Sequence, residues 1–194
     1  MGLLLLGPLL LLIALAIKLD SPGPVLFRQT RVGRHGVVFR IHKFRTMRHL
    51  DHAASNGEAA QITVGADPRI TRVGAVLRRT KLDELAQLID VLCGRMSLVG
   101  PRPEVPRYLP HYPAHLRDKL LSVRPGITDA ASLAFRDESG LLANAADAER
   151  EYLQVVLPAK LALSARGIDE ASFAGDLKLM AMTVAALWSG RPRG

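Results

Sequence analysis

Several features that would place this chain in a familiar class of protein are scarce or missing. Its 194 residues include one cysteine, Cys93, so no disulfide can form within the chain, and a reducing compartment is the simplest setting. Aromatic residues make up only 5% of the chain, which leaves few rings on which nucleic-acid bases could stack. There is no Walker A loop, no pair of cysteines at metal-binding spacing and no G-x-S-x-G nucleophile elbow.

Negative charge is also in short supply. Lysine and arginine number 26 against 18 aspartate and glutamate residues, which gives a formal net charge of +8. Such an excess implies an anionic partner: nucleic acid, an anionic membrane face or a phosphorylated substrate. No motif of a nucleic-acid-binding domain is present, so an anionic membrane face or a phosphorylated substrate is favoured. With 48% hydrophobic residues, the chain can build the core of one compact domain.

Charge is absent altogether from the first 17 residues, Met1 to Ile17. A straight helix of that length spans roughly 25 Å, less than the hydrocarbon core of about 30 Å. The segment also contains Gly7-Pro8, and proline removes a backbone donor and kinks a helix. A short apolar segment broken in this way is typical of a re-entrant or interfacial element rather than a membrane span.

Two other interpretations of this segment stay open. A secretory signal peptide would explain Ala14-Leu15-Ala16, which resembles a cleavage site, but no lysine or arginine precedes the apolar run as such a peptide requires. The other is a buried core helix of a soluble protein, although the segment is very rich in leucine for such a helix.

The rest of the pattern predicts a mainly α-helical fold with one small β-hairpin. Alternating apolar residues around a Gly-rich turn indicate the two strands, and a 3.6-residue apolar period indicates the longest helix, which Gly94 closes. Trp188 near the end of the last helix suits either a membrane–water interface or packing on the core. The expected strands cover residues 25–30 and 37–43, and the expected helices cover 72–92, 111–122, 145–163 with an interruption near Pro158, and 176–188.

The sharpest local feature is an acidic pair that follows three cations. Arg78, Arg79 and Lys81 precede Asp83 and Glu84 on one expected helix. Asp83 lies four residues after Arg79, so the two can pair on one helix face. Taken alone, the segment is typical of a solvated helix surface whose ion pairs contribute little to stability.

Other cations stand in stiff frames elsewhere in the chain. Arg102 lies between two prolines, Arg124 precedes a Pro-Gly pair, and Lys43 and Arg45 flank a phenylalanine. Arginine held in this way suits two-pronged binding of phosphate. A carboxylate beside such cations stays ionised and can then attack phosphorus or hold Mg²⁺. Together with the apolar segment, these residues indicate phosphate chemistry at a membrane.

Five segments in order make the chain resemble a known family. They are SPGPVLFRQTRVG (21–33), KFRTM (43–47), DPRITRVGAVLRRTKLDELAQL (67–88), MSLVGPRPE (96–104) and RPGIT (124–128). Over nearly its whole length the chain is similar to the bacterial sugar transferases of the monotopic phosphoglycosyltransferase class, also called polyprenyl-phosphate sugar-phosphate transferases.

The resemblance implies an enzyme that moves a sugar-1-phosphate from a UDP-sugar to undecaprenyl phosphate and releases UMP. Asp83 matches the proposed nucleophile, which forms a covalent phospho-sugar intermediate, and Glu84 matches a residue that assists as a base or arranges the site. Mg²⁺ would bridge Asp83 and the diphosphate. The sugar and the final polysaccharide or glycoconjugate stay open. The cations expected to hold phosphate or brace the site are Lys43, Arg78, Arg102 and Arg124. Arg45 is included as a further candidate because it lies in the same KFRTM segment as Lys43.

The resemblance also implies an architecture and a location. Residues 1–19 would form a re-entrant helix, broken at Gly7-Pro8, that enters and leaves the bacterial inner membrane on its cytoplasmic side. Residues 20–194 would form the catalytic domain on that face, with amphipathic helices on the anionic membrane surface. Downstream glycosyltransferases are further candidate partners, and nucleic acid is not expected. The alternative is a catalytically idle membrane adaptor in a polysaccharide assembly complex, which would release no UMP.

The chain departs from the family pattern at several positions. Only seven residues precede Pro8, so either the first limb of the re-entrant helix is shortened or the protein begins further upstream. Ala86 stands where proline is usual, Arg95 where an acid is usual, and Asp129 where glycine is usual. Because Asp129 adjoins the RPGIT segment, it is expected to influence sugar choice or activity.

Overall fold

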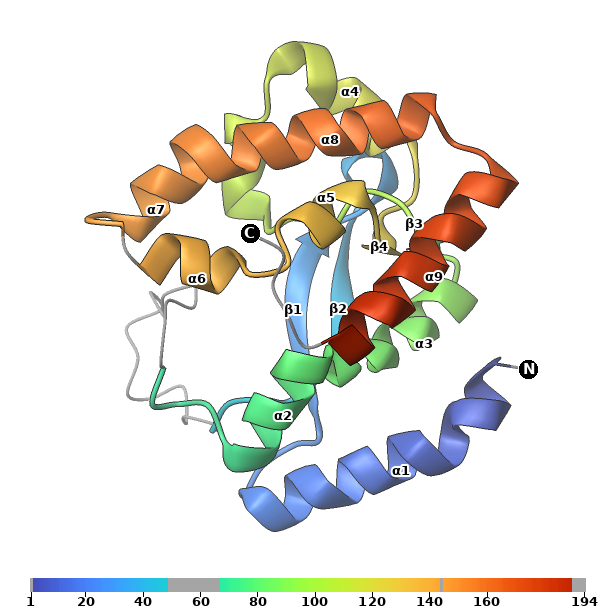
Figure 1. Cartoon of the computed structure of the whole chain (residues 1–194), viewed down its shortest axis with the longest axis vertical. Helices are drawn as coiled ribbons and strands as arrows, with labels where there is room; N and C mark the ends of the chain where they lie inside the picture. Colours follow the sequence, from blue (N-terminus) through green and yellow to red (C-terminus); the bar gives the residue numbers. More distant parts are fainter. Residues whose placement is uncertain (1, 49–66, 144, 190–194) are drawn as a thin grey trace.

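The fold is mainly helical, with two small two-stranded sheets (Figure 1). A computed structural model of the chain describes residues 2–48, 67–143 and 145–189. The elements in chain order are α1 Gly2–Asp20, β1 Leu26–Val32, the short 3-10 turn η1 Arg34–Gly36, β2 Val38–Phe44, α2 Arg72–Thr80, the 3-10 helix η2 Leu82–Gln87, α3 Leu88–Leu92, β3 Ser97–Val99, the 3-10 helix η3 Pro106–His111, α4 Ala114–Ser122, β4 Gly126–Thr128, α5 Ala130–Ala134, α6 Glu138–Ala143, α7 Ala148–Glu151, the π-turn η4 Tyr152–Val156, α8 Leu157–Asp169 and α9 Phe173–Ser189.

The predicted β-hairpin is confirmed, with strand ends shifted by one or two residues. β1 and β2 pair antiparallel, from Leu26 opposite Phe44 to Val32 opposite Val38. The turn between them uses positive φ angles at His35 and Gly36, which glycine adopts without strain. Because side chains alternate along a strand, the odd-numbered residues of the hairpin share one face. That face bears Lys43, and β2 packs against η2.

The predicted continuous helix over residues 72–92 is wrong. Thr71 caps α2 by accepting a hydrogen bond from the backbone N–H of Gly74, and Lys81 then ends the helix in a left-handed conformation with φ 55°. The chain continues as the tighter η2 before it resumes as α3. Periodicity did not reveal the break, because leucines at these spacings fit an α-helix and a short 3-10 segment alike. The break matters because η2 carries the acidic pair.

A parallel pair of short strands brings two proline-rich segments together. Ser97 lies opposite Gly126 and Val99 opposite Thr128. The backbones meet so closely that a Cβ atom on Gly126 would lie 2.1 Å from the backbone nitrogen of Gly100. Glycine is therefore required there, and the contact places the residues around Arg102 beside the loop before β4.

The C-terminal half packs around one hydrophobic cluster under α8. The interruption expected near Pro158 takes the form of the π-turn η4, directly before the proline, so the helix from α7 to α8 keeps its course. The helix predicted at 111–122 starts at Ala114, after η3, and the last helix starts at Phe173. The buried members of the cluster are Val105, Tyr108, Leu120, Leu142, Tyr152, Val156, Leu157, Leu161 and Ala165.

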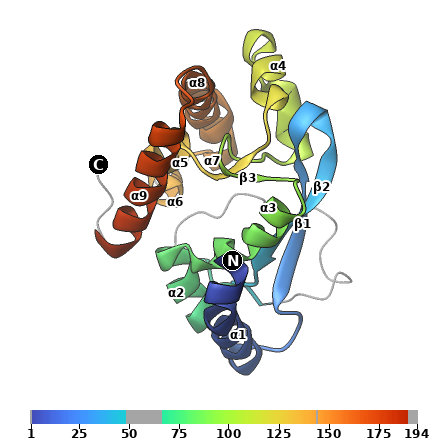
Figure 2. The ribbon, with the colours of Figure 1, turned by 90° about the vertical axis from the view of Figure 1, so that its right-hand side faces the viewer.

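The N-terminal segment is a single helix, α1, that continues through Pro8. The helix is thus not interrupted at Gly7-Pro8 as predicted, although the ribbon bends near its N-terminal end (Figure 1). One side of α1 packs on the rest of the chain through Ile13 and Ile17, which join a cluster with Phe44. α1 and α2 lie together at one end of the hairpin, and α4 lies at the other (Figure 2).

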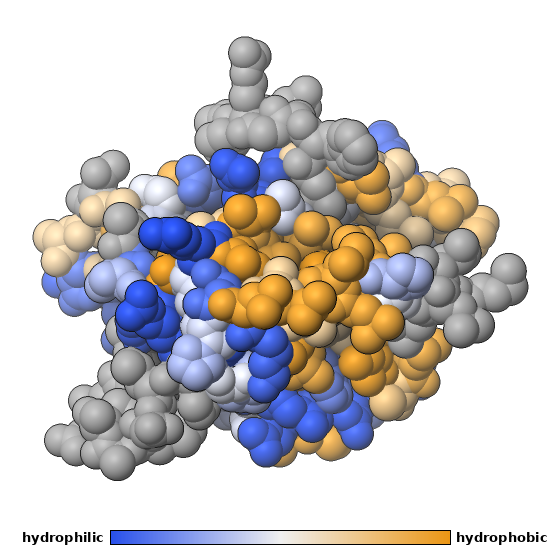
Figure 3. All heavy atoms as spheres, turned by 90° about the horizontal axis from the view of Figure 1, so that it is seen from below, coloured by the Kyte–Doolittle hydropathy of each residue, from blue (hydrophilic) through white to orange (hydrophobic). Residues whose placement is uncertain are grey.

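The other side of α1 is an exposed leucine face, formed by Leu11, Leu12, Leu15 and Leu19. The view from below shows apolar side chains gathered from the middle of this side of the molecule toward the right, with polar ones mainly to the left and below (Figure 3). The core-helix interpretation therefore holds for one side of α1 only. Among the described residues, no helix combines the length and apolarity that crossing a membrane requires.

Candidate active site

The acidic pair lies buried between η2 and the hairpin. Asp83 is 1% exposed and Glu84 is 7% exposed, so the interpretation of this segment as a solvated helix surface is wrong. Carboxylates are rarely enclosed to this degree unless cations face them. The structure provides those cations from two other segments.

Lys43 approaches both carboxylates from β2. Its Nζ lies 2.8 Å from Oδ2 of Asp83 and 3.6 Å from Oε1 of Glu84. The strand register fixes this position, because Lys43 is on the odd-numbered face of the hairpin that packs on η2. The ammonium therefore stabilises negative charge on both residues at once.

Arg102 binds Glu84 with two parallel contacts. Nη2 donates to Oε1 at 2.7 Å and Nη1 donates to Oε2 at 3.2 Å. Burial alone would raise the pKa of Glu84, but the charges of Arg102 and Lys43 outweigh it and hold that pKa well below its ordinary value. Glu84 in turn raises the pKa of Arg102. Glu84 and Arg102 therefore both stay ionised at neutral pH.

Arg78 lies next to this group, on the last turn of α2. Its Nε donates to the hydroxyl oxygen of Thr46 at 3.1 Å. Burial lowers the pKa of Arg78, and the negative charge of Asp83 opposes that shift. The structure thus brings Lys43 and Arg102 into contact with the acidic pair and leaves Arg78 within reach of the charge of Asp83, while their predicted role in holding phosphate stays a prediction.

The remaining two predicted cations are placed differently. Arg45 donates to the carbonyl oxygens of Ser21 at 2.8 Å and Ile17 at 3.4 Å, and also to that of Pro22. It therefore satisfies the C-terminal end of α1 and braces that helix rather than the acidic pair. Arg124 is exposed in the loop before β4, where its backbone adjoins Gly100.

Two carboxylates that sequence reasoning missed, the buried Asp90 and the partly buried Glu104, hold the site together. Asp90 is fully enclosed and accepts from the backbone N–H of His42 at 2.8 Å, while its other oxygen lies 2.9 Å from Nδ1 of the same residue. This pair fastens β2 to α3, one residue before Lys43. Glu104 accepts from the hydroxyl of Tyr152 at 2.6 Å and lies 3.5 Å from Arg31. Only its place after the P-R-P segment could have indicated Glu104 in advance.

The acidic pair fits a divalent cation held jointly with substrate. Oδ1 of Asp83 is buried and has no hydrogen-bond partner among the residues that the structure describes. Mg²⁺ typically takes one or two protein carboxylates and completes its coordination with phosphate oxygens and water. Within residues 2–48, 67–143 and 145–189, no three histidine, cysteine or acidic side chains gather as a self-sufficient metal site. The donor set thus suits a metal that arrives with a phosphorylated ligand.

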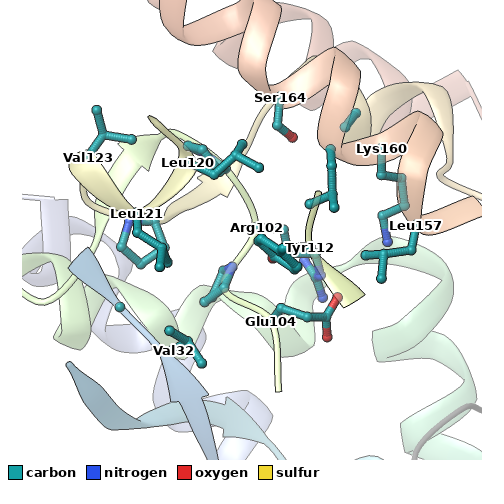
Figure 4. A pocket seen from close by; sticks show the side chains of 16 residues that line it. Val32, Arg102, Glu104, Tyr112, Leu120, Leu121, Val123, Leu157, Lys160 and Ser164 are labelled. Carbon is teal, nitrogen blue, oxygen red and sulfur yellow. The ribbon is translucent and has the colours of Figure 1, made fainter. Parts of the chain in front are cut away.

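A cavity of about 40 Å³ lies behind Arg102, between the P-R-P segment and α8. Figure 4 shows Arg102, Tyr112 and Lys160 converging on it. Both cations already have acidic partners, since Lys160 forms a salt bridge with Glu138 and Arg102 forms one with Glu84. Much of the remaining lining is leucine and valine. The cavity therefore offers little to an anion and supports the back of the site.

The comparison with known proteins decides the family. The family model described as "Bacterial sugar transferase" matches residues 1–190. The chain belongs to the bacterial sugar transferase family. The resemblance read from the five segments is thereby confirmed.

Individual relatives in this family differ in the sugar that their names specify. The chain is 46% identical over 143 residues to the UDP-glucose:undecaprenyl-phosphate glucose-1-phosphate transferase of Escherichia coli strain K12, an alignment that covers 72% of this chain and 30% of the relative. It is 58% identical over 101 residues to the exopolysaccharide production protein PSS of Rhizobium leguminosarum bv. phaseoli, covering 52% and 49%. It is 44% identical over 131 residues to an Aeromonas hydrophila UDP-N-acetylgalactosamine-undecaprenyl-phosphate N-acetylgalactosaminephosphotransferase, covering 66% and 30%. The matched part is thus about half or less of each of these relatives.

The positions that depart from the family pattern have structural roles. Asp129 caps α5 by accepting from the backbone N–H of Ser132 at 2.7 Å, and its other oxygen accepts from the hydroxyl of Ser164 at 2.6 Å. Ala86 is buried in the cluster beneath α1. Arg95 lies 3.7 Å from Asp90. The carboxylate of Asp129 therefore supports the fold, and its predicted influence on sugar choice stays a prediction.

Proposed function

We propose that the chain is the catalytic unit of a phosphoglycosyltransferase that converts a UDP-sugar and undecaprenyl phosphate into undecaprenyl diphosphate-sugar and UMP. The observation that carries the proposal is the buried Asp83–Glu84 pair beneath Lys43 and Arg102, in a family whose relatives are named for this transfer. Capsule, lipopolysaccharide and exopolysaccharide synthesis are the processes that would use the product.

Asp83 is the nucleophile in this proposal. Its Oδ1 has no hydrogen-bond partner, while Lys43 at Oδ2 stabilises the charged carboxylate. Oδ1 attacks the sugar-linked phosphorus of the UDP-sugar, the bond from that phosphorus to the oxygen of UMP breaks, and UMP leaves with the electron pair. A phosphate oxygen of undecaprenyl phosphate then attacks the same phosphorus, and the carboxylate of Asp83 is released.

Glu84 arranges the site rather than accepting a proton. Both of its oxygens are bound by Arg102, and its pKa is held well below the ordinary range, which makes it a weak base. Asp83, with its unpartnered oxygen, is the residue that would hold Mg²⁺. When bound, the metal would neutralise charge on the diphosphate.

The membrane contact is assigned to α1 and its leucine face. A lipid-linked acceptor must reach the buried pair from a bilayer, and Leu11, Leu12, Leu15 and Leu19 present apolar surface to it. In this arrangement residues 1–19 lie in the cytoplasmic leaflet of the bacterial inner membrane as a re-entrant anchor, and residues 20–194 rest on the anionic surface. Glycosyltransferases that extend the product would be the next partners.

The decisive experiment is the incubation of the purified protein with a panel of UDP-sugars, with and without undecaprenyl phosphate. UMP release that continues only when the acceptor is present supports the transferase. Without the acceptor, UMP should appear as a burst no larger than the enzyme concentration, and the protein should gain the mass of one sugar phosphate. An idle adaptor would release no UMP with any donor.

A further inference from the structure

A small recess opens beside the acidic pair, on the odd-numbered face of the hairpin. Its volume is about 20 Å³, room for one water-sized group. Two of its walls are the cations that hold the pair, Lys43 and Arg102. The side chains that give the recess its chemistry are Phe27, Gln29, Arg31 and Gln87.

Gln87 is the most informative of these residues. It is 2% exposed, yet its side-chain amide makes no hydrogen bond among the described residues. Glu84 and Gln87 are three positions apart on a 3-10 helix, so they share one face. Enclosing an amide without partners is unfavourable, so a ligand group that bonds to it would be stabilised. Because the residue lines the recess and is enclosed elsewhere, the recess is where a ligand can reach this amide.

Arg31 and Gln29 provide a second, independent observation on the β1 side. Arg31 donates from Nη1 to the carbonyl oxygen of Pro103 at 3.0 Å and from Nη2 to Oε1 of Gln29 at 2.8 Å. Its Nε is buried and has no partner within the described part of the chain. Since the oxygen of Gln29 is taken, its NH₂ group is what Gln29 can offer. The recess thus collects amide and guanidinium groups with unused hydrogen-bonding capacity.

Phe27 gives the mouth of the recess an apolar surface. It lies directly opposite Lys43 in the hairpin and is 48% exposed. A ligand that combines a carbon face with hydroxyl groups would match both the ring and the amides. A bare phosphate would not, because Lys43 and Arg102 are already engaged by Asp83 and Glu84.

We infer that the recess binds one edge of the donor's sugar, through a hydroxyl or acetamido group that bonds to Gln87 and Gln29, and that these contacts help the site to distinguish one sugar from another. This inference rests on the proposed function. The sugar is bonded to the phosphorus that Asp83 attacks, so it must lie next to the acidic pair, whereas the uracil is separated from that phosphorus by a second phosphate and a ribose. The recess is too small for the whole ring, which lies at its mouth against Phe27.

The test compares catalytic efficiency across four donors, UDP-glucose, UDP-galactose and their N-acetylamino counterparts. Gln87→Met removes the amide at similar volume, and it should change the ratio of kcat/KM between the best donor and at least one other by 10-fold or more. The more exposed Phe27→Ala should raise KM for the donors several-fold. For both variants the inhibition constant of UMP, which lacks the sugar, should stay within 2-fold of wild type.

Gln154→Met is the matched control, because Gln154 is exposed on η4 and bonds only to Arg150 on its own helix. It should leave donor ratios unchanged. The inference is overturned if both site variants reduce kcat/KM by the same factor for all four donors. It is also overturned if the inhibition constant of UMP rises in these variants, because that would place the nucleotide in the recess. A wild-type protein that uses no UDP-sugar would contradict the proposed function itself.

Discussion

At the scale of single residues, the two adjacent carboxylates differ in what their oxygens contact. Glu84 has both oxygens bound by Arg102, whereas Asp83 keeps Oδ1 free of hydrogen bonds and shares Oδ2 with Lys43. One carboxylate is therefore held in place while its neighbour is available for reaction. Neighbouring residues of one charge type acquire different roles because their surroundings differ.

Replacing Asp83 with asparagine should abolish the covalent half of the reaction. The change keeps the shape of the side chain but removes the charge and the nucleophilic carboxylate oxygen. Neither the UMP burst nor the mass gain of one sugar phosphate should appear, as measured by rapid quench and intact-protein mass spectrometry. Wild-type activity in Asp83→Asn, or UMP release only with both substrates present, would instead indicate direct transfer.

Replacing Arg102 with lysine should be damaging although the charge is kept. Lysine cannot offer the two parallel donors that Glu84 receives at 2.7 and 3.2 Å. We expect kcat/KM to fall by about 10-fold or more, which corresponds to about 1.4 kcal/mol of transition-state stabilisation. Steady-state UMP release measures this. Near-normal kinetics would mean that only the positive charge at position 102 matters.

The Glu84–Arg102 pair should also make stability depend on acid pH. Because the folded-state pKa of Glu84 lies below its unfolded value, its contribution is fully present above the unfolded pKa of about 4.3 and is lost as pH falls toward the folded value. Glu84→Gln should destabilise the protein by about 1 to 3 kcal/mol at pH 7, a range reduced from the usual cost of breaking a buried pair because Arg102 is partly exposed. Urea midpoints at pH 7 and pH 3 should show this difference shrinking with acid. A difference that does not change with pH would contradict the assigned ionisation.

At the scale of elements, the contact between β3 and β4 positions the P-R-P segment. Gly126→Ala would place a Cβ 2.1 Å from the backbone nitrogen of Gly100, so the strands must separate. We expect the free energy of unfolding to fall by about 2 to 3 kcal/mol. We also expect kcat/KM of the folded enzyme to fall, because Arg102 lies three residues after the end of β3.

Gly167→Ala is the matched control for that change. Gly167 lies inside α8 with no atom near the site of an added Cβ, so alanine should stabilise the helix by about 0.5 to 1 kcal/mol. Chemical denaturation of both variants checks the pair of predictions. Equal effects of the two changes would contradict the role of the strand contact.

At the scale of the whole molecule, the leucine face of α1 should control membrane binding. Leu15 on α1 and Leu141 on α6 are equally exposed, at 57% each. Leu15→Asp should reduce the fraction that floats with anionic vesicles several-fold, while Leu141→Asp should leave it unchanged, because only Leu15 belongs to the leucine face. Equal effects would mean that α1 is not the membrane contact.

The topology of α1 can be tested by cysteine labelling. Cysteines placed at positions 2 and 35 should label from the same side of the membrane if residues 1–19 form a re-entrant anchor. Labelling from opposite sides would indicate a membrane span instead.

The hairpin, the acidic pair and the family could all be read from the sequence. A two-residue period, a Gly-rich turn and five ordered motifs are local signals that survive without knowledge of the fold. The predicted cations Lys43, Arg78 and Arg102 followed from the same motifs, and the structure places Lys43 and Arg102 against Asp83 and Glu84.

Only the tertiary structure decided what those residues face. The break at Lys81 was hidden because an apolar period marks core positions, and here a 3-10 helix turns carboxylates inward instead. Their partners come from distant segments, with Arg102 lying 18 positions after Glu84. Arg45, in the same motif as Lys43, proved to cap α1. The sequence did not indicate that the amide of Gln87 would be enclosed without a partner among the described residues. Local pattern determined which elements and chemical groups the chain contains, whereas long-range packing decided which of those groups are buried, paired or left open to a ligand.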